Sequence, residues 1–264
     1  MSLLSGEILA KVYEDLAERQ SHVPLDEVKA RALTQPSAMD GACALRGGGV
    51  GVIGELEASR VSMGVLAGEY ELGGVNVVSV PVASDRSVEA LQAVREVRAR
   101  VQVPVLCKNL IVSGYQLWEA RAYGADLVLL VAAALEQEAL VSLVERTESI
   151  GMTAIVEVRD ERELLRAVGA GAGIINVNAR DHAALDVDQD ANSQLLPLIP
   201  EGILRVAECG QAGRAGLIAC ARAGADAVVV GAAQLAGTDP RAAVAGLVSV
   251  GAHPALSRGR RQVA

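Results

Sequence analysis

Eight short runs rich in Val, Ile and Leu recur along this chain of 264 residues, and stretches with helical apolar spacing separate most of them. Such alternation predicts right-handed β–α–β units, because each return to a parallel strand needs a crossover connection. The predicted strands cover residues 50–55, 75–80, 104–108, 127–131, 153–157, 173–177, 203–208 and 226–231. The predicted helices between them cover residues 87–100, 116–123, 136–149, 161–168, 214–222 and 241–250. Eight such units in a chain of this length are typical of a (β/α)₈ barrel.

An internal repeat, spaced by one hundred residues, favours closure of the sheet into a barrel. Gly124-Ala125-Asp126 precedes the fourth predicted strand, and Gly224-Ala225-Asp226 precedes the eighth, one hundred residues later. Glycines also precede the second and sixth predicted strands, where each could end a helix in the left-handed conformation. This spacing fits two halves of four units. We therefore predict an α/β fold of the TIM-barrel type, with a doubly wound open sheet as the alternative, since that fold could also reuse Gly-Ala-Asp.

Two further helical patterns, at residues 6–19 and 25–33, come before the first predicted strand. Residues 1–45 are therefore expected to form an N-terminal helical extension of a single domain that spans 1–264. No apolar run is long enough to cross a bilayer, and no basic residue precedes the apolar positions of the N-terminus, so we expect a cytoplasmic protein without a membrane partner.

The formal net charge of −8 argues against nucleic acid as a partner, because an acidic surface repels phosphate backbones. The four cysteines lack Cys-x-x-Cys spacing and the three histidines are scattered, so we expect neither a metal site nor a disulfide framework. The remaining class of partner is a small-molecule substrate. The oligomeric state is left open.

Polar residues gather where the predicted strands end. In a (β/α)₈ barrel these ends meet at one face, which holds the active site. The residues concerned are Glu55, Glu57, Lys108, Asn109, Glu157, Asn176, Asn178, Arg180 and Glu208. A lysine among several carboxylates is a plausible acid–base constellation. The alternative is a structural ring of ion pairs at the rim of the barrel.

Two of these residues suit proton transfer. Lys108 ends an apolar strand, where burial and neighbouring carboxylates would shift its pKa in opposite directions, and we predict that it is a general acid. Glu157 ends another apolar strand and is the predicted general base. Gly210 and Gly231 follow the seventh and eighth strands, where backbone amides could hold a phosphate group.

Several motifs in order resemble those of the indole-3-glycerol-phosphate synthase family. The segment PVLCKNLIVSGYQLWEARAYGADLVLL at 104–130 is similar to the family pattern PVLRKDF…YQ…EAR..GAD..LL. GMTAIVEV at 151–158, VNARD at 177–181 and AECG at 207–210 resemble further family motifs. The likeness covers nearly the whole chain. It implies a carbon–carbon lyase without a cofactor, which closes an indole ring on a carboxyphenylamino-deoxyribulose phosphate and releases CO₂ and water.

The resemblance also implies roles for individual residues. Lys108 stands at the family's general acid and Glu157 at its general base, and Glu55 matches a further catalytic position. The other positions that it matches are Asn178, Arg180 and Glu208 for the substrate, and Gly210 and Gly231 for its phosphate group.

The departures from the family pattern concentrate at the mouth of the predicted barrel. The family's first-strand motif is Glu-x-Lys-x-x-Ser-Pro-Ser, but here Glu57 replaces the lysine, and Arg60-Val61 replaces Ser-Pro. Cys209 replaces the serine of AESG, and Ala232 replaces an acidic residue after the eighth strand. The loops after the first two strands look shortened, at 64–70 and 83–87. We expect Glu57, Arg60 and Cys209 to contact the substrate and Ala232 to lie at the phosphate site.

Three functions remain open. The first is a diverged relative, as in specialised metabolism, that keeps Lys108 and Glu157 but acts on an altered anthranilate- or indole-related substrate, possibly phosphorylated. This interpretation is preferred because the departures spare the strands. The second is the ordinary synthase of tryptophan biosynthesis, with Arg60 replacing the missing lysine charge. The third is a non-catalytic barrel that binds a ligand or a partner protein.

Overall fold

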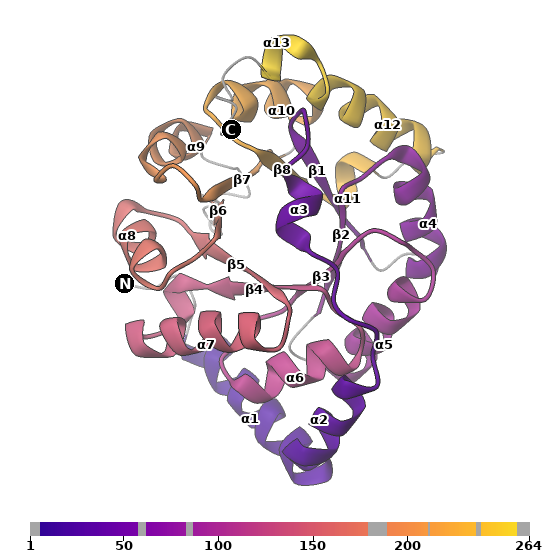
Figure 1. Ribbon diagram of the computed structural model, residues 1–264, viewed down its shortest axis with the longest axis vertical. Helices are drawn as coiled ribbons and strands as arrows, with labels where there is room; N and C mark the ends of the chain where they lie inside the picture. Colours follow the sequence, from indigo (N-terminus) through magenta and orange to yellow (C-terminus); the bar gives the residue numbers. More distant parts are fainter. Residues whose placement is uncertain are drawn as a thin grey trace.

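Eight parallel strands close into a barrel in the computed structural model, which describes residues 6–57, 62–82, 87–178, 189–210, 212–235 and 239–257 (Figure 1). The strands are β1 (Gly51–Glu55), β2 (Val77–Pro81), β3 (Val105–Lys108), β4 (Leu127–Val131), β5 (Thr153–Val158), β6 (Ile174–Val177), β7 (Leu204–Glu208) and β8 (Ala227–Val230). Each pairs with its sequence neighbours, and β1 also pairs with β8. The predicted barrel is confirmed, and the open sheet was the wrong alternative.

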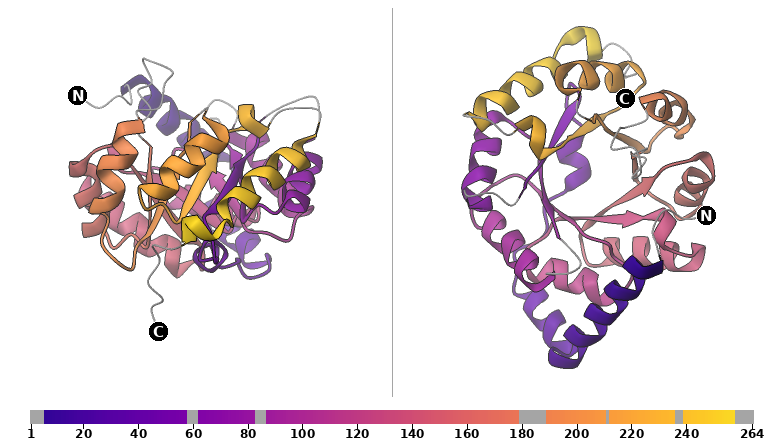
Figure 2. Two further views of the ribbon diagram at one scale, coloured as in Figure 1. Left: turned by 90° about the horizontal axis from the view of Figure 1, so that it is seen from above. Right: turned by 180° about the vertical axis from the view of Figure 1, so that it is seen from behind.

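Helices surround the strands as an outer ring (Figures 1 and 2). The ring consists of α4 (Met63–Gly73), α5 (Ser87–Arg98), α6 (Gly114–Ala122), α7 (Gln137–Ser149), α8 (Glu161–Gly169), α9 (Gln189–Leu195), α10 (Gly213–Arg222) and α12 (Pro240–Gly251). Shorter helices are α3 (Gly41–Leu45), η1 (Ala132–Ala134), η2 (Leu196–Leu198), α11 (Ala232–Leu235) and α13 (Pro254–Ser257). No helix in these described ranges is long and apolar enough to cross a membrane.

The sequence prediction missed α4, which occupies eleven residues where we expected only a shortened connection. Its sequence MGVLAGEYELG shows no clear helical period, because glycines occupy buried positions of this helix while the apolar Val65 and Leu72 are exposed. Gly73 is part of this packing: a Cβ atom there would lie 2.7 Å from Cβ of Val244 on α12. The glycines that obscured the helix in the sequence therefore permit its close contact with α12.

The Gly-Ala-Asp repeat at 124–126 and 224–226 has a structural cause. Gly124 and Gly224 both have positive φ, 93° and 102°, and each leads the chain from a helix into a strand. The Asp126 carboxylate then accepts a hydrogen bond of 2.9 Å from the amide of Val105, at the start of β3. Asp226 accepts one of the same length from the amide of Arg205, near the start of β7. Each aspartate thus fixes the beginning of the strand that precedes it in the barrel.

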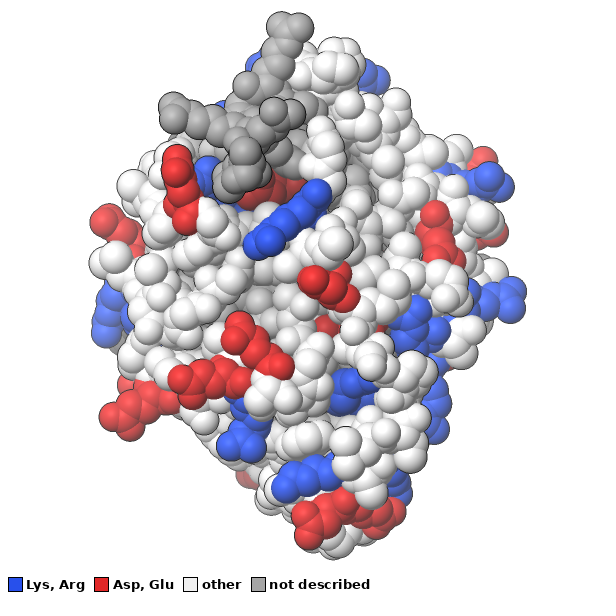
Figure 3. Space-filling model, viewed as in Figure 1, with Lys and Arg blue, Asp and Glu red and all other residues white. Residues whose placement is uncertain are grey.

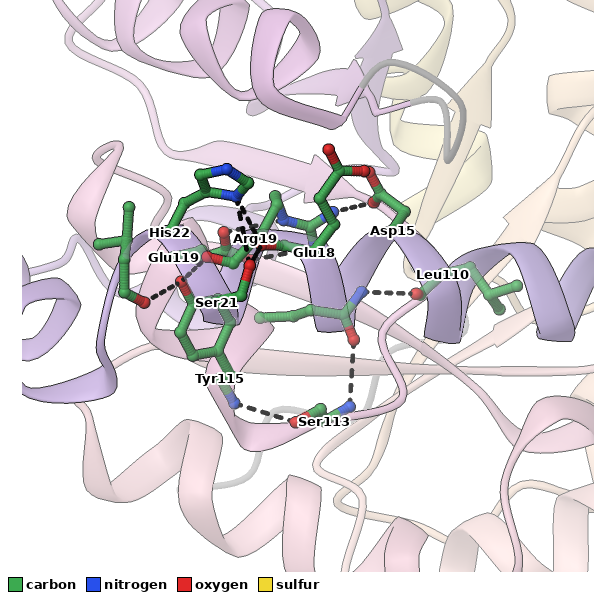
Figure 4. Close-up of polar contacts among 11 residues, drawn as sticks. Asp15, Glu18, Arg19, Ser21, His22, Leu110, Ser113, Tyr115 and Glu119 are labelled. Atoms are coloured by element: carbon green, nitrogen blue, oxygen red, sulfur yellow. Dashed lines mark hydrogen bonds and ion pairs between the residues drawn. The ribbon is translucent and has the colours of Figure 1, made fainter.

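Helices α1 (Gly6–His22) and α2 (Leu25–Leu33) confirm the expected N-terminal helices and pack beside α6 (Figure 1). The guanidinium of Arg19 forms two hydrogen bonds with the Glu119 carboxylate, of 3.0 and 3.1 Å, and also pairs with Asp15 (Figure 4). The Tyr115 hydroxyl donates to the carbonyl of Val23 at 2.9 Å. Buried polar contacts therefore attach the extension to α6, the helix that follows β3.

The barrel interior is filled by side chains in layers, as is usual for this fold. The odd-numbered strands contribute Ile53, Leu106, Ile155 and Val206, and the even-numbered strands contribute Ser79, Leu129, Asn176 and Val229. At the amino ends of the strands, α3 lies across the ring, and its Leu45 packs against this interior cluster (Figure 1). The opposite, carboxyl ends of the strands carry Glu55, Lys108, Glu157 and Glu208, whereas Asn176, which the sequence also placed at the mouth, lies in this interior layer.

Candidate active site

Beyond the apolar layer of the odd-numbered strands, toward their carboxyl ends, the next layer of inward-pointing side chains is ionisable. Side chains two residues apart on a strand point to the same side. The residues two positions after the apolar odd-strand layer are Glu55 on β1, Lys108 on β3, Glu157 on β5 and Glu208 on β7. The sequence prediction that these four side chains share one mouth is therefore confirmed.

The Lys108 ammonium lies between two carboxylates. Its Nζ is 2.8 Å from Oε2 of Glu55 and 3.4 Å from Oε1 of Glu208. Burial alone would lower the pKa of Lys108, but the charges of Glu208 and Glu55 together outweigh that effect and raise it. Of the two opposing effects expected from the sequence, the carboxylates prevail, and the lysine stays protonated.

The Glu157 side chain is more buried than that of Lys108, and its neighbours differ from those of Lys108. Its Oε2 accepts a hydrogen bond of 3.1 Å from the side-chain amide of Asn178, which follows β6. Burial raises the pKa of the Glu157 carboxyl, and the nearby charge of Glu208 raises it further, while the Asn178 hydrogen bond opposes both. A buried carboxylate with a raised pKa is a stronger base than a free one, and this is suited to accepting a proton.

The two glycines predicted at the phosphate site lie where β7 and β8 end. Gly210 has φ of 56° and precedes α10, and Gly231 directly precedes α11, whose first residue is Ala232. In (β/α)₈ barrels this region, with the start of a short extra helix, commonly binds phosphate. Phosphate binding at Gly210 and Gly231 stays a prediction.

Cys209 is also at this end, but its side chain is buried. Its Sγ donates to the carbonyl of Val229 at 3.3 Å, and burial raises the pKa of the thiol to about 12. A thiol with so high a pKa is almost entirely protonated at neutral pH and is a poor nucleophile. Contact between Cys209 and a substrate stays a prediction, which would more readily involve its backbone than its thiol.

The sequence matches known proteins along most of its length. The family model described as indole-3-glycerol phosphate synthase matches residues 6–247. The chain belongs to this family. The indole-3-glycerol phosphate synthase of Streptomyces griseus is 54% identical over 98% of this chain and all of its own length. Indole-3-glycerol phosphate synthase 1 of Streptomyces coelicolor is 52% identical with the same coverage.

Solved structures with the same architecture are more distant in sequence. The 3-hexulose-6-phosphate synthase of Salmonella typhimurium superimposes with a TM-score of 0.64 at 19% identity, covering 77% of this chain and all of that one. At this identity the likeness describes the fold alone.

Compared with the family pattern, the remaining departures lie at the edge of the described site. Glu57, which stands at the family's lysine position, is exposed and is the last described residue before residues 58–61. Arg60 and Arg180 both lie outside the described residues, so their predicted contacts with substrate stay predictions. Tyr70 of α4 was not singled out from the sequence. Its pKa is raised to about 12 by burial and then by the charges of Glu57 and Glu55.

Asn192 is another residue near the site that sequence reasoning missed. It is buried on α9, and its Nδ2 donates to the backbone carbonyl of Glu208 at 3.0 Å. This bond fixes the end of β7, where Glu208 turns toward Lys108. The sequence held no signal for it, because α9 has no clear helical period and Asn192 is far from any strand end in sequence.

The outer surface carries no comparable concentration of charge on the face seen in Figure 3. Basic and acidic side chains are interspersed over its described part (Figure 3). Among the described residues, no group of three or more His, Cys, Asp or Glu side chains could hold a metal ion. The ionisable layer at the mouth is thus the feature of the described structure that best supports chemistry.

Proposed function

We propose that this protein is an indole-3-glycerol-phosphate synthase of tryptophan biosynthesis, which closes the indole ring of a carboxyphenylamino-deoxyribulose phosphate with loss of CO₂ and water. The observation that carries the proposal is the layer of Glu55, Lys108, Glu157 and Glu208 at the mouth. Full-length relatives with more than half of their residues identical carry that name. The departures from the family pattern favoured a diverged relative, whereas these full-length relatives favour the ordinary synthase instead.

Lys108 would act as the general acid. When a carbon of the aromatic ring attacks the substrate ketone, negative charge develops on the ketone oxygen, and the Lys108 ammonium can donate a proton to it. The carboxyl group then leaves as CO₂ and returns its bonding electrons to the ring. Glu55 and Glu208 keep Lys108 charged and hold it in place for this step.

Glu157 would act as the general base. In the dehydration the new hydroxyl leaves as water with a proton from Lys108, and the ring methylene carbon beside the nitrogen loses a proton to the Glu157 carboxylate, which forms the C=C bond of the indole. Asn178 orients that carboxylate through its hydrogen bond. The turnover consumes one proton from solvent, since Lys108 donates two and Glu157 recovers one.

The substrate's phosphate group would bind beside Gly210, Gly231 and Ala232. Backbone amides at helix starts attract anions. Arg180 would add a positive charge, and Arg60 could attract the substrate carboxylate in place of the family's lysine.

A steady-state assay with the family's substrate tests the proposal. We expect turnover by the unmodified protein and a loss of kcat/KM of about 10²–10⁴-fold in Lys108→Ala, the usual contribution of a general acid. Lys11→Ala is the matched control, because Lys11 is exposed on α1, and it should leave activity unchanged. The unmodified gene should also restore growth of a synthase-deficient strain without tryptophan.

The diverged relative remains a second candidate because of Glu57. Replacing a lysine by a glutamate changes the local charge from +1 to −1, and two like charges ~4 Å apart repel by ~1 kcal/mol in water and more at lower dielectric. If the unmodified protein is inactive on the family's substrate and Glu57→Lys gains turnover, the second candidate is correct. Inactivity of both proteins would contradict both enzymes and favour a barrel that only binds a ligand or a partner.

A further inference from the structure

A small cavity lies on the barrel axis directly beneath the ionisable layer. Its volume is about 10 Å³, and its walls are the odd-strand layer, the even-strand layer, Lys108 and Glu208. Such a volume is at the lower limit for holding one water molecule and is too small for two. The cavity therefore lies inside the protein core and in contact with the groups proposed for catalysis.

Two buried polar side chains line this cavity. Ser79 is on β2 and Asn176 is on β6, which are opposite strands of the eight-stranded ring. Their relative exposures are 0% and 2%. Neither Oγ of Ser79 nor Oδ1 of Asn176 has a hydrogen-bond partner within the described part of the chain. A buried polar atom without a partner is costly, so native proteins usually satisfy such atoms with protein groups or ordered water.

The other two members of the same layer are Leu129 and Val229, which are apolar. The polar pair is therefore confined to one line across the barrel, and apolar walls bound it on both sides. This arrangement suits a single bridging water in one position. A water needs two to four polar partners, and the polar groups that line the cavity are Ser79, Asn176, Lys108 and Glu208.

We propose that Ser79 and Asn176 bind one internal water molecule, which connects them to Lys108 and Glu208. The Ser79 hydroxyl or the Lys108 ammonium donates to the water, and the water donates to Asn176 Oδ1 and the Glu208 carboxylate. Ser79 and Asn176 are thereby positioning residues, which act on Lys108 from below through the water. This catalytic role rests on the proposed function, but the water site itself does not.

A crystal structure at about 1.5 Å resolution tests the site directly. We expect one density peak within hydrogen-bond distance of both Ser79 Oγ and Asn176 Oδ1, and its loss in Asn176→Leu, whose side chain fills the space. A wild-type map without the peak would overturn the proposal, whatever the activity of the enzyme.

Urea unfolding of Ser79→Ala distinguishes a bound water from a dry cavity by the direction in which the unfolding midpoint shifts. If the water is bound, Ser79→Ala removes a satisfied hydrogen bond, and the unfolding midpoint falls. If the cavity is dry, the same change removes an unsatisfied buried hydroxyl, and the midpoint rises, which contradicts the proposal.

Kinetics test the positioning role. We expect kcat to fall about tenfold in Asn176→Leu with KM within twofold, the size expected for one hydrogen bond to a charged group. Leu129→Val, which removes a methylene from the same layer without touching a polar atom, should keep kcat within twofold. Equal losses in both variants would reject the positioning role. An inactive wild-type protein would reject the proposed function, while the density and the unfolding midpoint would still decide the water site.

Discussion

The side-chain amide of Asn178 donates a hydrogen bond to Oε2 of Glu157 over 3.1 Å, and both residues are buried at the mouth of the barrel. The bond stabilises the charged form of a carboxyl whose pKa burial has raised. It thereby limits how far the pKa of the proposed base rises, and this has a measurable consequence for the pH dependence of activity.

In Asn178→Ala, the Glu157 carboxylate loses this stabilisation, so its pKa should rise further above the ordinary value. The proposed base is active only when deprotonated, so activity disappears as pH falls through that pKa. The acid limb of the kcat/KM profile should therefore move to higher pH. The profile of the unmodified protein is the reference, and an acid limb that does not move would argue against Glu157 as the base.

The buried pair between Arg19 and Glu119 should be necessary for stability. Its side chains are only 8% and 10% exposed, so Arg19→Ala leaves an unpaired carboxylate in the protein and should lower the free energy of unfolding by about 3 kcal/mol. The double variant Arg19→Met with Glu119→Leu should recover most of this loss. Arg31→Ala is the control, because its pair with Glu27 is about half exposed and should contribute under about 1 kcal/mol. Equal effects of Arg19→Ala and Arg31→Ala in urea unfolding would refute this expectation.

Asp126 should contribute more to stability than an ordinary helix-capping aspartate. Its carboxylate accepts from the Val105 amide, the Met39 amide and the Arg98 guanidinium, and it is almost fully buried. Asp126→Ala should lower the free energy of unfolding by about 3–5 kcal/mol. Asp239→Ala, which removes the exposed N-cap of α12, should cost only about 1 kcal/mol. Denaturant titration of the two variants compares them, and a smaller loss for Asp126→Ala would contradict the expectation.

The thiols should differ sharply in reactivity. Cys43 is exposed, whereas Cys107, Cys209 and Cys220 are buried, and burial raises the pKa of these three to about 12, 12 and 11. Ellman's reagent at pH 8 should therefore modify one thiol per native chain and four after unfolding in denaturant. Cys43→Ala should remove the rapid reaction. A thiol that still reacts rapidly in that variant would contradict the expectation and show that the native core opens.

Much of the barrel could be predicted because its strands are buried on both sides. Such strands are nearly continuous runs of branched apolar residues, and β4 was predicted with its observed bounds. Helices with one polar face, such as α7 and α8, were also evident. Two helices of the outer ring, α4 and α9, were not predicted, because their composition leaves no regular alternation of polar and apolar residues.

The site was predictable to the extent that strand ends and side-chain alternation define it. Lys108 and Glu157 each end an apolar run, and a parallel barrel brings such ends together. Asn192, by contrast, reaches Glu208 only through the tertiary fold. The cavity between Ser79 and Asn176 depends on how the strands are offset around the ring, and no local pattern in the sequence encodes that offset.

The pairing of β1 with β8 also fixes when the site can exist during synthesis on the ribosome. Glu55 and Lys108 emerge first, and Glu208 and the closing strand β8 emerge later. At 5–20 residues per second, the early strands wait roughly ten seconds or more for their last neighbour. Until then β1 presents an unpaired edge, and Lys108 lacks one of its two carboxylates. The nascent chain can therefore acquire its acid–base layer only after β7 and β8 have been synthesised.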